Sequence, residues 1–159
     1  MIAISHPHYY SSMVEWSNSF GGIPIYLHEL DRKHIVYPFE SINFWIGESI
    51  SPTRGIRLVN LGGHFEGGTV LHWGDGASGK GVVLSGDIIQ VVPDRSWASF
   101  MYSYPNLIPL PESKIRQIWN RISKYEFDRV YGAFEGRQIL GNARERVEKS
   151  AERYIAHIK

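Results

Sequence analysis

The sequence predicts an α/β fold in which strands come first and helices pack outside them. Between positions 24 and 84, short apolar runs rich in β-branched residues alternate with glycine and proline turns, a pattern typical of strands. Beyond Pro111, apolar residues recur at helical intervals in two segments. The chain has 159 residues, of which 43% are hydrophobic. We therefore expect one folded domain spanning residues 1–159.

The N-terminal segment, residues 4–11, places two histidines two positions apart, directly after a short apolar run. Alternate residues of an extended segment point to the same side. His6 and His8 are therefore predicted to converge on one point. Neutral imidazole is among the commonest protein ligands for zinc, so this pair is a candidate for half of a metal site.

A short helix is predicted next, because Met13, Trp16 and Phe20 have the spacing that buries one side of a helix. Glycines at 21 and 22 end it. Residues 24–27 then form a predicted strand, followed by a helical turn from position 28. His28 and His34 lie in this region, and we expect both to be structural or exposed rather than metal ligands.

The middle of the chain holds four more predicted strands and two turns. The glycine-rich loop 74–80 lacks the spacing of a phosphate-binding loop and leads into a strand, so it predicts a hairpin. The cluster at 51–55 predicts the other turn. The strands are residues 42–46, 56–61, 69–73 and 81–84.

Two further metal-ligating side chains lie in this region. His64 sits among four glycines, which permit close approach of backbone and ligand. Asp87 follows the last of the four strands. Cysteine is absent, so any transition metal must be held by nitrogen and oxygen atoms.

In their order along the chain, His6, His8, His64 and Asp87 resemble the metal-binding motifs of the metallo-β-lactamase superfamily. Its pattern is His-x-His-x-Asp-His, then Gly-His in a turn, then Asp after a strand, then a late His. The resemblance covers nearly the whole chain but only about the later two-thirds of a family member. It implies a sandwich of mixed β-sheet and outer helices that lacks the usual N-terminal hairpins.

The chain departs from the family pattern at three positions. Tyr10 and Ser11 stand where the family has the Asp and the His that follow the first pair, and Ala133 stands in place of the late His. The resemblance therefore implies one metal ion, most simply zinc, at His6, His8, His64 and Asp87. Asp87 would also act in catalysis, and Tyr10 either donates a hydrogen bond to a developing oxyanion or packs.

Residues 88–111 are rich in aromatic residues and proline and show little periodicity. A long segment of this kind that starts beside a candidate ligand is either a wall of the substrate pocket or a cover for the core. In the first case, Tyr102 and Tyr104 contact substrate. In the second, these tyrosines pack together with Trp97 and Phe100.

Two helices and one strand complete the chain. The first helix opens at Pro111-Glu112 and buries Ile115, Ile118, Trp119 and Ile122. A strand is predicted at residues 127–131. Asn142 is the predicted cap of the last helix, whose apolar residues recur up to Ile158.

The composition excludes some functions. A net charge of +1 gives no general attraction to nucleic acid, and no apolar run approaches the length of a signal peptide or a membrane span. We expect a cytoplasmic protein with a small-molecule substrate. An uncovered sheet face would also favour a homodimer.

Two functions remain open from the sequence. The first is a hydrolase that uses a metal-bound hydroxide on a small ester, thioester or lactone. The second is a truncated, degenerate relative that binds metal or a protein partner without turnover.

Overall fold

The computed structural model describes residues 1–158, and its largest sheet has six strands in the order β13-β12-β7-β6-β5-β4. Strands β7 and β12 pair in parallel and the other neighbours are antiparallel. The α/β prediction is confirmed, and β6 and β7 form the expected hairpin. The strands are β4 (Ser49–Thr53), β5 (Ile56–Asn60), β6 (Thr69–Trp73), β7 (Val82–Gly86), β12 (Arg129–Gly132) and β13 (Gln138–Ile139).

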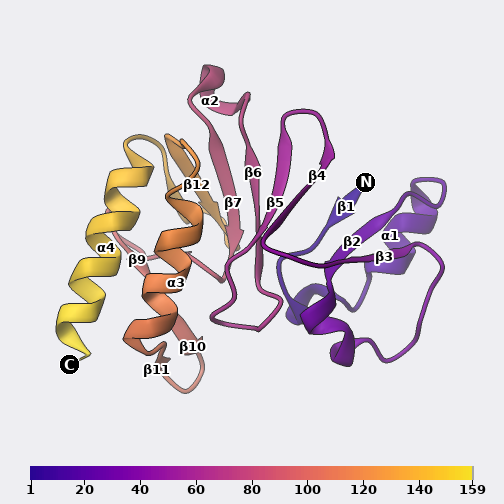
Figure 1. Cartoon of the computed structure of the whole chain (residues 1–159), viewed down its shortest axis with the longest axis horizontal. Coiled ribbons are helices and arrows are strands. Elements are labelled where there is room, and N and C mark those ends of the chain that lie inside the picture. Colours follow the sequence, from indigo (N-terminus) through magenta and orange to yellow (C-terminus); the bar gives the residue numbers. More distant parts are fainter. Residues whose placement is uncertain (159) are drawn as a thin grey trace.

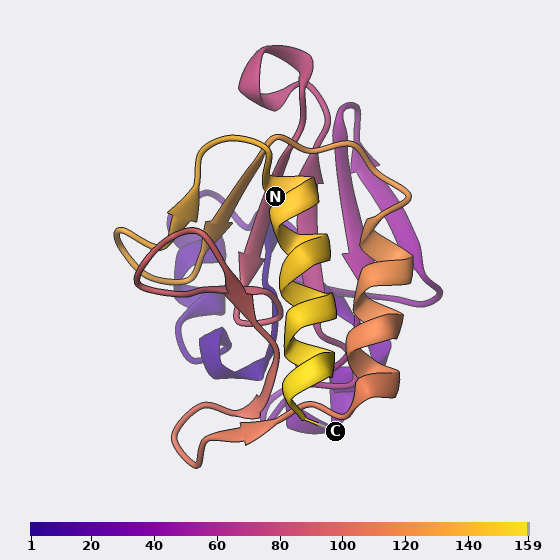
Figure 2. The same cartoon turned by 90° about the vertical axis from the view of Figure 1, so that its left-hand side faces the viewer.

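Helices α3 (Glu112–Ile122) and α4 (Ala143–His157) lie side by side over one face of this sheet (Figures 1 and 2). The predicted stripe of α3 is confirmed, because Ile115, Ile118 and Ile122 are fully buried. Trp119, its fourth member, is partly buried and packs against the same core. The capping prediction is wrong in its mechanism. Asn142 stands at the cap position, but in a left-handed conformation, and its side chain makes no capping hydrogen bond.

A second sheet of three parallel strands lies on the opposite side of the six-stranded sheet from the two helices (Figure 1). Its core contains Met13, Ile25 and Leu27. Its elements are β1 (Ile2–Ala3), β2 (Ile25–His28) and β3 (Ile42–Trp45), accompanied by α1 (Met13–Ser19) and by the 3-10 helices η1 (Pro7–Tyr9) and η2 (Glu29–His34).

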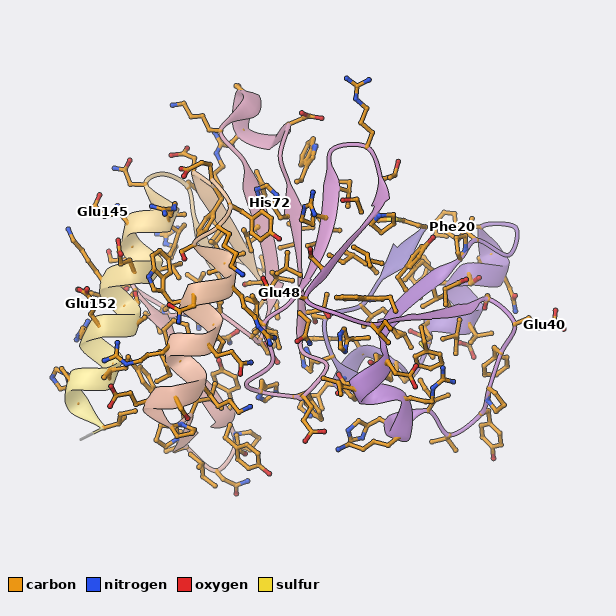
Figure 3. All side chains as sticks on the ribbon, in the orientation of Figure 1. Phe20, Glu40, Glu48, His72, Glu145 and Glu152 are labelled. Atoms are coloured by element: carbon orange, nitrogen blue, oxygen red, sulfur yellow. The ribbon has the colours of Figure 1, made fainter. Side chains whose placement is uncertain are left out.

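The buried stripe predicted for α1 is wrong at two of its three residues. Trp16 and Phe20 are 57% and 60% exposed and stack on each other at 6.0 Å between ring centroids. Met13 is buried as predicted, but the second inward residue is Ser17, one turn further along the helix. Figure 3 shows Phe20 at the outer side of this part of the molecule.

An apolar row crosses the face of the large sheet that points away from α3 and α4. Its members are direct cross-strand partners, from Ile50 through Leu58, Leu71 and Leu84 to Tyr131. Leu58 is fully buried, whereas Leu84 is 44% exposed. The apolar row is therefore buried at β5 and becomes more exposed to solvent toward β7 and β12.

Four short strands follow β7, so the irregular segment 88–111 has more structure than predicted. They are β8 (Gln90–Val91), β9 (Ala98–Ser99), β10 (Met101–Ser103) and β11 (Ile108–Pro109). Strand β4 was missed, because Ser51, Pro52 and Thr53 belong to it rather than to a turn. The one-turn element α2 (Gly76–Gly79) closes the β6–β7 loop. Within residues 1–158 no helix is long and apolar enough to cross a membrane.

Candidate metal centre

The four candidate ligands His6, His8, His64 and Asp87 lie together, each offering one ligand atom, and these atoms are all within 4.8 Å of one another. They come from separate parts of the fold. The two first histidines lie at the start of η1, His64 in the turn between β5 and β6, and Asp87 directly after β7. Residues far apart in the sequence thus meet at one point, as the order of the motifs implied.

The route by which His6 and His8 converge differs from the prediction. Strand β1 ends at Ala3, and only His6 has extended backbone angles, at φ −169° and ψ 169°. Pro7 then begins the 3-10 helix that contains His8. The two rings stand 4.9 Å apart at an interplanar angle of 74°. A tight helical turn, not alternation along a strand, brings them together.

Three buried atoms in the cluster have no hydrogen-bond partner in the described chain: Nε2 of His6, Nε2 of His64 and Oδ1 of Asp87. The other Asp87 oxygen lies 3.4 Å from His6 Nε2. An unsatisfied buried polar atom costs about 1–3 kcal/mol, so three at one point call for an external partner. Two imidazole nitrogens and a carboxylate oxygen that face each other fit a divalent cation.

The outer nitrogens of the two buried histidines are anchored. His64 Nδ1 lies 3.1 Å from the Met101 carbonyl oxygen. A carbonyl can only accept, so this Nδ1 donates its proton and Nε2 keeps a lone pair for a ligand. His6 Nδ1 lies 2.9 Å from Ser5 Oγ. Such contacts fix both the ring orientation and the nitrogen that faces the cluster.

Electrostatics also favour the neutral, ligand form of His8 and His64. Burial lowers the pKa of His64, and the nearby His6 and His8 add to the effect. Burial likewise lowers the pKa of His8, with His6 contributing. A neutral imidazole is the form that binds a metal, so the cluster is prepared for a cation near neutral pH.

Comparison of the backbone with solved structures identifies the fold. A B3 metallo-β-lactamase with an active-site glutamic acid superposes with a TM-score of 0.62 at 16% identity, over 98% of this chain and 67% of that chain. The metallo-β-lactamase MIM-1 from Novosphingobium pentaromativorans gives 0.60 at 16% identity, over 98% and 67%. The chain has the metallo-β-lactamase fold. A metallo-β-lactamase family protein from Thermus thermophilus gives 0.57 at 16% identity, over 99% and 60%.

Among curated proteins, the chain is 53% identical over 154 residues to the uncharacterized protein YmaE of Bacillus subtilis (strain 168). The match covers 97% of this chain and 56% of YmaE. The chain thus spans little more than half the length of this relative. No family model matches the sequence.

Tyr104 and Tyr102 lie beside the cluster in different ways. The Tyr104 hydroxyl donates to the carbonyl oxygen of Asp87 at 3.1 Å, and its ring lies 5.6 Å from that of His64. Burial raises the pKa of Tyr104, so its hydroxyl stays protonated as a donor. Tyr102 is 60% exposed and lines a cavity of ≈ 540 Å³ together with His8 and His64. Tyr104 therefore braces the candidate ligand Asp87, and Tyr102 lines the open side of the cavity.

Tyr10 is not brought to the cluster. Its side chain packs against the core of the three-stranded sheet. Together with Ser11, it lines a separate cavity of ≈ 470 Å³. Tyr9 lies there instead, with its ring 4.9 Å from the His6 ring. Tyr9 was not identified from the sequence as a site residue, although its position in the same turn as both histidines could have indicated it. Among residues 1–158, the group of His, Asp and Glu side chains that could hold a metal ion consists of His6, His8, His64 and Asp87.

The histidines predicted to lie outside the site have other roles. His28 is buried, with Nε2 at 3.0 Å from the Gly47 carbonyl oxygen, and its Nδ1 accepts from Leu30 N at the start of η2. His34 is exposed, and its ring packs edge-on against Phe65 at 5.4 Å. Both are absent from the metal cluster.

Proposed function

We propose that the chain is a metal-dependent hydrolase of a small ester, thioester or lactone, with one zinc ion at His6, His8, His64 and Asp87. The observation that carries the proposal is the convergence of these ligand atoms within 4.8 Å, with three of them buried and unpaired. The adjoining cavity of ≈ 540 Å³ is large enough for a small-molecule substrate.

When bound, a catalytic zinc ion lowers the pKa of a water to about 7 and polarises a carbonyl group. The residues of the chain position the reacting groups around it. Asp87 has one oxygen toward His6 and a second, Oδ1, without a partner, which can accept a hydrogen bond from a water. Tyr104 holds the Asp87 backbone, and Tyr102 contacts the substrate at the exposed rim. Tyr10 as an oxyanion donor stays a prediction without a contact to support it.

The stoichiometry in this proposal follows from the residues that replace ligands of the family pattern. Tyr10, Ser11 and Ala133 stand where a second ion would need an acid and two histidines. The same replacements favour the alternative function, a non-catalytic relative that binds metal or a protein partner. Metal binding is compatible with both functions, and turnover distinguishes them.

The test is a screen of simple esters, thioesters and lactones with the zinc-loaded chain. His64→Ala removes a ligand and should abolish hydrolysis. Asp87→Asn keeps the shape but removes the charge, so turnover should fall further than metal affinity. His72→Gln changes a histidine whose Nε2 contacts the Glu126 carbonyl, and it serves as the control with native activity.

Two results would reject the hydrolase. Activity that survives both His64→Ala and Asp87→Asn would place the chemistry elsewhere. Zinc binding without turnover on any substrate class would select the non-catalytic alternative. A homodimer through the uncovered sheet face and a cytoplasmic location belong to the same proposal and stay predictions.

A further inference from the structure

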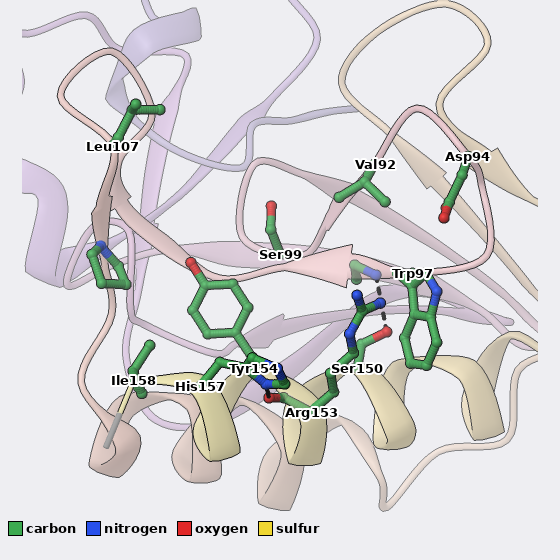
Figure 4. Close-up of a pocket in the computed structure, with 12 residues that line it drawn as sticks. Val92, Asp94, Trp97, Ser99, Leu107, Ser150, Arg153, Tyr154, His157 and Ile158 are labelled. Carbon is green, nitrogen blue, oxygen red and sulfur yellow. Dashed lines mark hydrogen bonds between the residues drawn. The ribbon is translucent and has the colours of Figure 1, made fainter.

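A second cavity, of ≈ 490 Å³, lies between α4 and the β8–β9 and β10–β11 segments (Figure 4). None of the four candidate metal ligands lines it. Its apolar wall includes Val92, Trp97, Leu107 and Ile158. The volume is within the range of small-molecule sites, and the apolar wall favours a ligand with a hydrocarbon or aromatic part.

Arg153 supplies a cation in this cavity. Its guanidinium lies 4.3 Å from the centre of the Trp97 ring, and no carboxylate of the described chain forms an ion pair with it. Asp94 lines the same cavity, but its Oδ1 accepts from Ser96 N at 2.8 Å. A guanidinium that stacks on an aromatic ring keeps its N–H edges free, and their geometry matches a carboxylate.

His157 lies one helical turn beyond Arg153 and also lines the cavity. Its Nδ1 lies 2.8 Å from the Arg153 carbonyl oxygen and donates to it, which leaves Nε2 for a ligand. Figure 4 shows Arg153, Tyr154 and His157 on the side of α4 that faces the cavity. The polar groups therefore gather on the helix, opposite much of the apolar wall.

Two residues of this cavity also contact residues that anchor candidate metal ligands, so the coupling argued from them rests on the proposed metal centre. Tyr154 donates its hydroxyl proton to the Met101 sulfur, and the Met101 carbonyl accepts from His64. Ser99 is hydrogen-bonded to the Tyr104 hydroxyl, which donates to the Asp87 carbonyl. A ligand that displaces Tyr154 or Ser99 thus acts on the orientation of His64 or Asp87.

We propose that this cavity is a second ligand site, which takes a small carboxylate with an apolar tail and is coupled to the metal centre. The guanidinium of Arg153 binds the carboxylate, and the wall formed by Val92, Trp97 and Leu107 takes the tail. Binding at one site then changes affinity at the other, and thermodynamic linkage requires the two changes to be equal.

Calorimetric titration of octanoate into the metal-free chain tests the site without depending on the metal centre. We expect saturable binding of one octanoate, weakened at least about tenfold in Arg153→Gln, because a charge-assisted hydrogen-bond pair is lost. Lys149→Gln removes one positive charge from α4 outside the cavity, where Lys149 pairs with Glu145, and should bind as the native chain does. Acetate and octylammonium, which lack the tail and the negative charge respectively, should bind far more weakly.

Equal octanoate affinity in the native chain, Lys149→Gln and Arg153→Gln would overturn the site, as would absence of saturable binding. The coupling is measured as the zinc affinity with and without saturating octanoate, and we expect a change of about fivefold or more. That change must vanish in Arg153→Gln. A change that persists there would mean that octanoate acts at the metal itself, and an unchanged zinc affinity in the native chain would overturn the coupling.

Discussion

Replacing Gly86 by alanine tests how the fold holds the metal centre. Gly86 has φ +54°, a conformation that residues with a Cβ rarely adopt. An added Cβ would lie 2.8 Å from Ser5 Cβ and would also collide with Ser5 Oγ. Ser5 Oγ is the partner of His6 Nδ1 at 2.9 Å. The side chain of Ser5 must therefore move, and the anchor of His6 moves with it.

The magnitude has two parts. The left-handed backbone costs about 1–2 kcal/mol for alanine. Loss of an outer contact to a histidine ligand typically costs about 10–100-fold in metal affinity. Urea unfolding of the metal-free chain measures the first part, and competition with a zinc chelator measures the second.

Gly136→Ala is the matched control, because Gly136 has φ +74° and no atom within 4 Å of the added Cβ. It should show the backbone cost alone and native zinc affinity. If Gly86→Ala binds zinc as tightly as Gly136→Ala does, the Ser5 contact does not position His6, and the reasoning is refuted.

Three more perturbations test other parts of the structure. Zinc at about 100 times its dissociation constant should raise the free energy of unfolding by about 2.7 kcal/mol. Chelation of the zinc should reverse this increase. The same increase in His64→Ala would contradict the proposed site. Burial raises the pKa of Asp31 above its ordinary value, so the folded state holds this proton more tightly and the contribution of Asp31 to stability should fall as pH rises from about 4. Asp31→Asn should remove that contribution, so stability should rise more steeply, or fall less, with pH in the variant than in the native chain in urea titrations between about pH 4 and 7, and identical slopes in the two would disprove the assignment. Sedimentation should show a dimer that Leu84→Asp converts to monomer, whereas a native monomer at high concentration would exclude pairing through the apolar row.

The cluster of candidate ligands was predictable from sequence because it depends on residue type and order. His6, His8, His64 and Asp87 were found from their chemistry and from the succession of motifs, and the structure brings them together. The backbone that joins His6 to His8 was not predictable by strand alternation. Pro7 fixes the first residue of a 3-10 turn, and this local effect outweighs the apolar run before it.

The anchor of His64 could not be inferred from the sequence, because it is a long-range contact to a backbone group. The Met101 carbonyl that holds His64 comes from 37 positions away and belongs to the backbone, so its residue type carries no signal. Tyr10 was assigned from its place in a motif, but its side chain follows the apolar core. Trp16 and Phe20 had helical spacing, yet the helix turns Met13 and Ser17 inward.

The most direct test of the proposed metal centre is the zinc content and location in crystals of the zinc-loaded chain. We predict one ion per chain, with anomalous scattering between His6, His8, His64 and Asp87, and loss of that signal in His64→Ala. Two tightly held ions per chain, or an unchanged signal in the variant, would contradict it.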